Sequence, residues 1–300
     1  MKIALHSVSY AGTWAEDTLS LEETIDRTAD LGYAGILLMA KRGHASVLDL
    51  GPSQRERLRA QLERRGLEVA GMAAYTDFTV GGDRPDVPLS EMQVLYVDEC
   101  ARLAADLGSG VVRVFTGYER PDLAPSQAWA RCVDAIRECG VRAAEHGVVI
   151  AVQNHHDVAN HHEALRDFVL EVGLPNVKLG FDAWAPALHG LDSKSLESAA
   201  RELAPLTVQT IVADYVLRRR FRFERDLNSY REEPPSTVAV PIGEGFIDYE
   251  SFLRGLFSGG FDGYVIYEMC SPLRGGGSLD NLDRHARRFV EWAAATHTGS

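Results

Sequence analysis

The sequence predicts a single α/β domain folded as a closed (β/α)8 (TIM) barrel, and three observations support this. Eight apolar segments of strand length alternate with segments of helical periodicity along the whole chain. The apolar segments are nearly continuous, which is typical of parallel strands covered by helices. The chain has 300 residues, of which 45% are hydrophobic, and this length suits one barrel of this kind.

The predicted strands are short apolar runs followed by polar residues. They cover residues 2–7, 34–39, 68–74, 111–115, 148–153, 177–181, 207–213 and 263–268. An open doubly wound sheet is the alternative. However, Ser-Val-Ser-Tyr follows the first strand, where a dinucleotide-binding sheet would carry GxGxxG, and the chain shows no Walker pattern. The closed barrel is therefore the preferred prediction.

The helices between these strands have recognisable ends. Ser20, Ser53 and Ser90 are each followed three residues later by Glu or Gln, which is the pattern of a capping box. Pro125 opens a further helix that runs to about residue 146. Glycines follow several helical segments and can take the left-handed conformation that ends a helix. Each predicted helix thus connects two consecutive strands.

The chain shows no linker that would divide it, so residues 1–298 are predicted to form one domain. The longest irregular stretch covers about residues 214–247 and carries an arginine-rich run and Glu-Glu-Pro-Pro-Ser. We expect it to form a long loop after the seventh strand, on the face where barrels keep their chemistry. Residues 299–300, Gly-Ser, are typical of a cloning remnant.

Charge and composition argue against several classes of partner. The chain has 31 Lys and Arg residues against 43 Asp and Glu residues, a net charge of −12. This disfavours nucleic acid and anionic membrane surfaces as partners. No apolar run reaches the roughly 20 residues that cross a bilayer, and the amino terminus does not resemble a signal peptide. The four cysteines form no CxxC pair. We therefore expect a cytoplasmic protein with reduced thiols that binds a small molecule.

Two carboxylates lie directly at the ends of apolar strands. Asp182 follows the sixth strand and Glu268 ends the eighth, and a carboxylate in such a place is costly unless it is paired, protonated or bound to a cation. Together with Gln153 on the fifth strand and Gln209 on the seventh, they would form a site for one divalent cation. The alternative is that Asp182 caps a turn and Glu268 pairs with an arginine of the long loop.

His155 is the favoured general base, because it directly follows a buried strand and imidazole titrates near neutral pH. The alternative is that His155 only orients a ligand of the cation. Glu268 is a second candidate for a catalytic role. Side chains expected to contact the substrate are His6, Lys41, Tyr118, His156, Trp184 and Arg218.

Five segments carry a resemblance to a known family. VQNHHD, LGFDAWAP, VQTIVADY, VPIGEGFIDYESFL and YVIYEMCSP resemble the corresponding segments of the xylose isomerase-like TIM barrel superfamily, which includes sugar phosphate isomerases and epimerases. The resemblance covers nearly the whole chain. It implies one divalent cation, most often Mn²⁺ with Mg²⁺ or Co²⁺ as alternatives, held by Glu, Asp, His and Glu side chains on strands five to eight.

The ligand positions of this family fall on four residues of the chain. Asp182 and Glu268 match the family pattern, whereas Gln153 replaces the usual glutamate of strand five. The histidine position of strand seven falls on Gln209, with Ile211 as the other candidate, which cannot ligate. A glutamine amide cannot transfer a proton, so His155 would replace the missing acid as the base.

The resemblance implies chemistry through a sugar enolate. The segment NHHD resembles a branch that acts on 3-keto sugars or glycosides, including C-glycoside deglycosidases that cleave by β-elimination. Isomerisation, epimerisation and elimination share the enolate intermediate, so all three reactions stay open. A non-catalytic subunit with a weakened metal site and, less favoured, a metal-dependent phosphodiesterase or endonuclease are the alternatives. Barrels of this type also form homo-oligomers or associate with a small second subunit, and we expect one of these arrangements.

Overall fold

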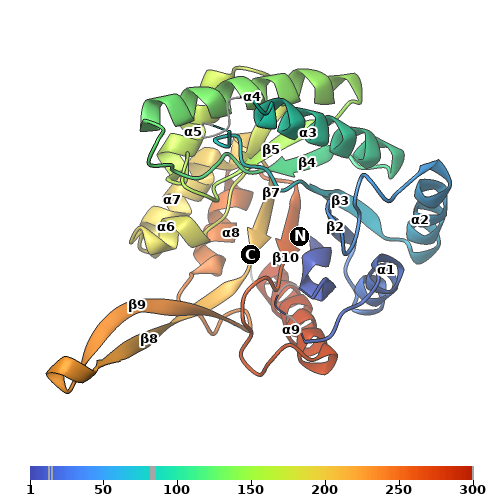
Figure 1. Cartoon of the computed structure of the whole chain (residues 1–300). Helices are drawn as coiled ribbons and strands as arrows, with labels where there is room; N and C mark the ends of the chain where they lie inside the picture. Colours follow the sequence, from blue (N-terminus) through green and yellow to red (C-terminus); the bar gives the residue numbers. More distant parts are fainter. Residues whose placement is uncertain (13, 15, 82–85, 299–300) are drawn as a thin grey trace.

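The computed structural model describes residues 1–298 except 13, 15 and 82–85, and it contains a closed barrel of eight parallel strands (Figure 1). The barrel strands are β1 (Lys2–His6), β2 (Gly35–Met39), β3 (Glu68–Ala73), β4 (Val111–Val114), β5 (Val149–Gln153), β6 (Val177–Gly180), β7 (Thr207–Val212) and β10 (Tyr264–Tyr267). Each pairs with the next in order around the barrel, and β10 closes it against β1. The predicted fold class is confirmed.

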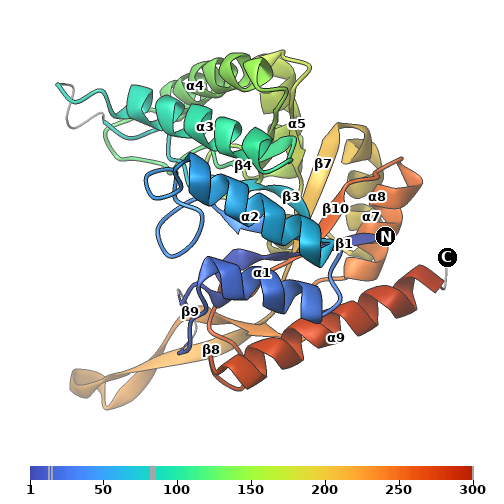
Figure 2. The same cartoon turned by 90° about the vertical axis from the view of Figure 1, so that its right-hand side faces the viewer.

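Helices connect the strands and cover the outside of the barrel, as two perpendicular views show (Figures 1 and 2). They are α1 (Leu21–Asp30), α2 (Pro52–Arg65), α3 (Leu89–Asp106), α4 (Pro125–Glu145), α5 (His162–Val172), α6 (Trp184–Leu188), α7 (Ser193–Leu203), α8 (Tyr249–Ser258) and α9 (Leu279–Thr298). Gly66 and Gly173 end α2 and α5 in the left-handed conformation, which a residue with a side chain would adopt only with strain.

The helix starts agree only in part with the prediction. Ser20 forms the expected capping box with Glu23 at the start of α1. The predictions for Ser53 and Ser90 were wrong, because both helices begin earlier. Pro52 takes the first position of α2, where its missing N–H costs nothing. The helix α3 begins at Leu89, so Ser90 lies inside its first turn.

The hydrophobic core has two parts, separated by the wall of the barrel. The larger part lies between the strands and the helices. The smaller part fills the barrel interior with Ala4, Leu37, Ala70, Ala73, Ile211 and Ile266. This inner layer closes the barrel beneath the carboxyl ends of the strands, so the polar side chains that follow the strands project into a mouth with a solid floor.

The segment predicted as a long loop forms a β-hairpin that projects from the barrel (Figure 1). Its strands are β8 (Asp214–Glu224) and β9 (Ser229–Val240), paired antiparallel over most of their length. Their outer parts are exposed, so the side chains lack the apolar alternation by which a half-buried strand is recognised. Two prolines in β9 also argued against a strand, and a bulge accommodates the irregular pairing there.

The base of this hairpin is fixed by one buried carboxylate. Asp214 accepts hydrogen bonds from the backbone N–H groups of Gly243 at 2.9 Å and Gly245 at 2.8 Å. A side chain at Gly245 would collide with the Asp214 carboxylate. The Gly-Glu-Gly segment of the resemblance thus joins the hairpin to the barrel.

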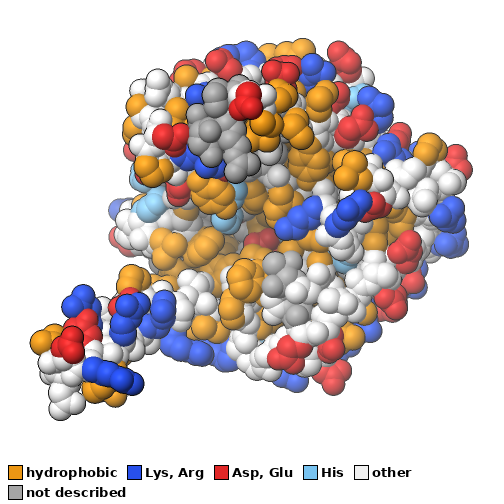
Figure 3. Space-filling view, viewed as in Figure 1, with side chains coloured by type: hydrophobic (Ala, Val, Ile, Leu, Met, Phe, Trp, Pro, Cys, Tyr) orange, Lys and Arg blue, Asp and Glu red, His pale blue; other side chains and the backbone are white. Residues whose placement is uncertain are grey.

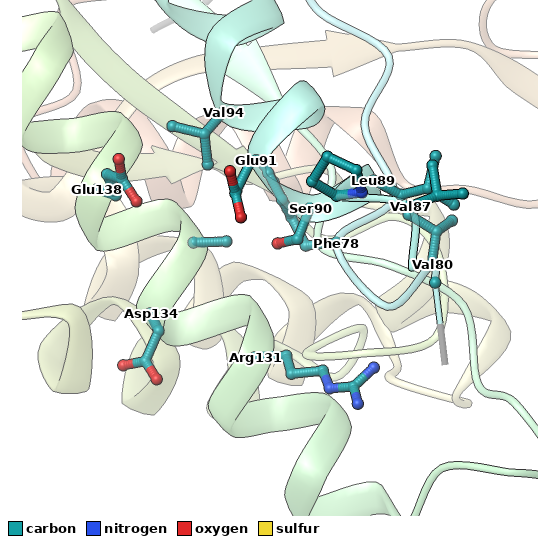
Figure 4. Close-up of a pocket in the computed structure, with 13 residues that line it drawn as sticks. Phe78, Val80, Val87, Leu89, Ser90, Glu91, Val94, Arg131, Asp134 and Glu138 are labelled. Atoms are coloured by element: carbon teal, nitrogen blue, oxygen red, sulfur yellow. The ribbon is translucent and has the colours of Figure 1, made fainter. Parts of the chain in front are cut away.

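No helix among the described residues is both long and apolar enough to cross a lipid bilayer. A cleft of about 450 Å³ lies between α3, α4 and the segment that joins β3 to α3 (Figure 4), and it is lined by none of the predicted site residues. Residues 299–300, interpreted as a cloning remnant, lie outside the described part of the chain.

Candidate active site

Asp182 follows β6 at the mouth of the barrel, and hydrogen bonds fix both its carboxylate and its backbone. One carboxylate oxygen accepts a hydrogen bond from the backbone N–H of Ile211 at 2.7 Å, and the other accepts one from the amide of Gln153. The side chain of Asn154 bonds to the backbone of Asp182 at both its N–H and its C=O group. The ends of β5, β6 and β7 thus fix the Asp182 carboxyl group in one position.

Burial raises the pKa of Asp182 to about 8, although the N–H of Ile211 acts in the opposite direction. The negative charge of Glu268 contributes to this rise. Asp182 is 8% exposed. Without a cation in the mouth, Asp182 is therefore mostly protonated at neutral pH.

Glu268 lies directly after β10 and contacts the first strand. The Nδ1 atom of His6 is 2.9 Å from one of its carboxylate oxygens, and the thiol of Cys270 donates to the other at 2.9 Å. Burial acts to raise the pKa of Glu268. The hydrogen bond and the positive charge of His6, followed by the hydrogen bond of Cys270 and the charge of Arg113, outweigh this effect, so the pKa lies below its usual value. Burial also lowers the pKa of His6, which is 1% exposed. The Glu268 carboxylate is thus ionised at neutral pH, and the Nδ1 atom of His6 donates to it.

His155 lies beside this pair and carries its proton on a defined nitrogen. Its Nδ1 atom accepts a hydrogen bond of 2.7 Å from the backbone N–H of His156. Burial lowers the pKa of His155, although the charge of Glu268 acts to raise it, so the ring is neutral at neutral pH. A neutral ring that accepts at Nδ1 carries its proton at Nε2. In this arrangement His155 offers the mouth a hydrogen-bond donor.

Three predicted contact residues line a cavity of about 240 Å³ next to His155. Tyr118 stacks on His156 with ring centroids 3.9 Å apart, and Trp184 lies 5.9 Å from the ring of His155. The Nε1 atom of Trp184 is buried without a partner among the described residues. Histidine and hydrophobic side chains gather toward the middle of this face of the molecule (Figure 3). The cavity thus offers aromatic faces, which suit a sugar ring.

Gln209 also lies inside the barrel, but deeper than the Asp182 carboxyl group. Its register partner on β10 is Tyr264, four positions before Glu268, and its amide oxygen lies against Gly71. Both polar atoms of its amide are buried without a partner among the described residues. At the level of Asp182, strand β7 instead supplies the backbone N–H of Ile211.

Arg113 is the residue at the mouth that the sequence reasoning missed. It lies on β4, is 1% exposed and donates from its guanidinium to the backbone oxygen of Ala74 at 3.0 Å. Its guanidinium carbon lies 4.0 Å from the ring centre of Phe115 and 5.0 Å from that of Tyr75. The signal was present in the sequence, because a charged residue interrupts the apolar run Val-Val-Arg-Val-Phe.

The other two predicted contact residues lie in different surroundings. Lys41 follows β2, and its Nζ atom lies 3.9 Å from the ring centre of Tyr75, next to Arg113. Arg218 is exposed on the hairpin, where it pairs across the strands with Ser236. Among the described residues, no hydrogen bond or ion pair joins Arg218 to the side chains of the mouth.

The mouth offers three oxygen donors to a cation, namely the carboxylates of Asp182 and Glu268 and the amide oxygen of Gln153. That amide oxygen is buried and has no hydrogen-bond partner within the described residues. Over the same residues, no group of three or more His, Cys, Asp or Glu side chains is placed to hold a metal ion. Asp182 and Glu268 thus supply only two charged ligands, and a third ligand would have to be the amide oxygen of Gln153. Oxygen ligands of this kind suit a hard cation such as Mn²⁺ or Mg²⁺.

The chain belongs to the xylose isomerase-like TIM barrel family, whose sequence model matches residues 25–292. No curated protein matches the sequence.

Solved structures share the fold over nearly the full length of the chain. D-psicose 3-epimerase from Clostridium cellulolyticum H10 has a TM-score of 0.74 at 17% identity and covers 99% of each chain. A xylose isomerase domain protein from Alicyclobacillus acidocaldarius has a TM-score of 0.70 at 21% identity and covers 99% of each chain. The probable 3-DHS dehydratase AsbF from Bacillus anthracis has a TM-score of 0.72 at 18% identity and covers 97% of this chain and 99% of its own. At these identities the likeness establishes the fold alone.

Proposed function

We propose that the protein is a sugar enzyme that removes a proton from the carbon next to a carbonyl group and works through an enolate. The observation that carries this proposal is the ionised Glu268, which is held by His6 and Cys270. Its charge acts on His155, which lines the aromatic cavity. A positioned carboxylate that is ionised at neutral pH can accept a proton from carbon. The family and the epimerase and dehydratase names of its structural neighbours support this chemistry.

The surrounding residues have separate roles in this proposal. Glu268 accepts the proton from carbon, and the Nε2–H of His155 donates to a substrate oxygen that gains negative charge. This reverses the role expected for His155, because its Nδ1 atom is already occupied by the N–H of His156. Trp184 and Tyr118 contact the ring of the sugar or of a leaving group.

A single divalent cation, Mn²⁺ in the first instance, would be held by Gln153, Asp182 and Glu268. When bound, it would polarise the carbonyl group of the substrate and stabilise the negative charge of the enolate. Gln209 lies deeper and would support this site from below. Return of the proton gives isomerisation or epimerisation, and loss of a substituent gives the β-elimination of a 3-keto glycoside.

The proposal is tested by hydrogen exchange in deuterium oxide. The protein is incubated with Mn²⁺ and a panel of ketoses, 3-keto sugars and 3-keto glycosides, and deuterium next to the carbonyl group is measured by NMR. We expect exchange in at least one substrate and a loss of about 10²-fold or more in Glu268→Gln. Glu63→Gln, an exposed glutamate on α2, is the matched control and keeps the wild-type rate. Absence of exchange from every substrate, with metal bound, would favour the non-catalytic alternative.

A further inference from the structure

We propose that Arg113 and Lys41 form a binding site for an anionic oxygen group of the substrate, a carboxylate or a phosphate, at the β2–β4 side of the mouth. This inference deepens the proposed function, because it assigns a substrate class to the same mouth. It rests on the placement of the two cationic side chains around Tyr75 and on the absence of a carboxylate partner for either.

Arg113 is a buried cation without a counter-ion. Among the described residues, no carboxylate oxygen lies within 4.0 Å of its guanidinium, and its Nε atom is buried with no hydrogen-bond partner. A buried charge without a partner costs several kcal/mol, so it is retained where a ligand completes it. A guanidinium that still has free N–H groups suits an anionic oxygen group.

The two carboxylates of the mouth do not fill this role. The oxygens of Asp182 accept from Ile211 and Gln153, and those of Glu268 are in contact with His6 and Cys270. Neither carboxylate therefore turns toward the guanidinium. The positive charge of Arg113 nevertheless acts to lower the pKa of both carboxylates, although burial raises the pKa of Asp182 overall.

The guanidinium of Arg113 also lies on the upper side of the barrel interior. Arg113 is in register with Ala73, an inner residue of β3, whereas Tyr75 and Phe115 follow the ends of β3 and β4. Its contacts with both rings place the guanidinium at the level where the strands end and the mouth begins.

Lys41 adds a second positive charge at the same ring. Its Nζ atom lies 3.9 Å from the centre of Tyr75, and it forms no ion pair within the described residues. Burial and the positive charge of Arg113 lower the pKa of Lys41. Two like charges at one ring repel each other, and an anionic ligand would relieve this repulsion.

The replacement of a carboxylate by Gln153 strengthens this charge imbalance. With a divalent cation bound to Asp182 and Glu268, positive charge in the mouth exceeds negative charge once Arg113 and Lys41 are counted. A neutral sugar would leave that excess uncompensated in a partly buried site. A sugar acid or a sugar phosphate would compensate it.

The test measures binding to the full chain by isothermal titration calorimetry, without turnover. D-gluconate is compared with its neutral counterpart D-sorbitol, and D-glucose 6-phosphate with D-glucose, each with and without Mn²⁺. We expect at least one anion to bind tenfold or more tightly than its neutral counterpart, and the stronger pair identifies carboxylate or phosphate. We expect Arg113→Met to reduce that ratio to within twofold and Lys41→Met to reduce it threefold or more.

Lys194→Met, an exposed lysine on α7, is the matched control and should keep the wild-type ratio. A ratio within twofold for both pairs in the wild-type protein, or an unchanged ratio in folded Arg113→Met, would overturn the proposal. If Arg113→Met does not fold, the affinity ratio of Lys41→Met, a variant of the exposed loop, tests the proposal, and an unchanged ratio overturns it. Binding and deuterium exchange are separate readouts, so anion binding without exchange would reject the proposed function while it supports this inference.

Discussion

Asp182 shows how one buried carboxyl group links the stability of the protein to pH. Its pKa rises from 3.8 to about 8 in the folded metal-free protein, so the folded state binds the proton more tightly than the unfolded chain. This contribution to stability is complete below about pH 4 and is lost as pH rises toward 8. A cation that binds the ionised form would restore stability at the upper end of this range.

We predict that Asp182→Asn removes this pH dependence. In the metal-free protein, the free energy of unfolding of the variant should exceed that of the wild type by more than about 1 kcal/mol at pH 8. The advantage should shrink toward pH 4, because asparagine resembles the protonated aspartic acid. Urea unfolding at several pH values measures the difference. Parallel pH profiles for the two proteins would refute the assigned burial effect.

Several site residues could be predicted from their places in the sequence. Asp182 and Glu268 each follow an apolar run, and parallel strands bring such positions to one rim. The proton position of His155 could not be predicted, because it depends on a hydrogen bond from the backbone N–H of His156 that only the folded loop forms. Arg113 was not predicted, because it lies inside a strand and not at its end. Its lack of a carboxylate partner is a property of the folded chain and is not visible in the sequence.

At the scale of elements, the barrel strands were predicted closely and the hairpin was not. A buried parallel strand leaves a continuous apolar run, so β5 and β7 differ from their predicted ranges by only one residue at one end. The outer part of β8 has no buried face and is held mainly by pairing with β9. Such a strand leaves no hydrophobic period to detect, and its anchor at Asp214 is a tertiary contact.

The start of α1 allows a direct test of local sequence signals. Ser20 caps the helix and exchanges hydrogen bonds with Glu23 in both directions. We predict that Ser20→Ala lowers the free energy of unfolding by about 1 kcal/mol, as for other capping serines. Ser53→Ala in α2, which lies past the cap at Gly51, should cost clearly less. Equal losses in urea unfolding would contradict the assignment of the two helix starts.

At the scale of the whole molecule, barrel closure assembles the candidate site. The parallel pairing of β1 with β10 joins the two ends of the chain and brings His6 to Glu268, 262 positions away. The neighbouring strands β5 and β6 add Gln153 and Asp182 in the same mouth. The site therefore requires the closed barrel, and no local segment of the chain contains it.

Titration of Mn²⁺ by calorimetry tests most directly whether these residues hold one cation. We predict that Gln153→Glu binds Mn²⁺ about tenfold or more tightly than the wild type, because a carboxylate replaces a neutral amide at a hard cation. Asp182→Asn should lose most of the affinity, and Gln127→Glu, on the exposed start of α4, should change nothing. Wild-type affinity in both Gln153→Glu and Asp182→Asn would show that the cation is not held by this mouth.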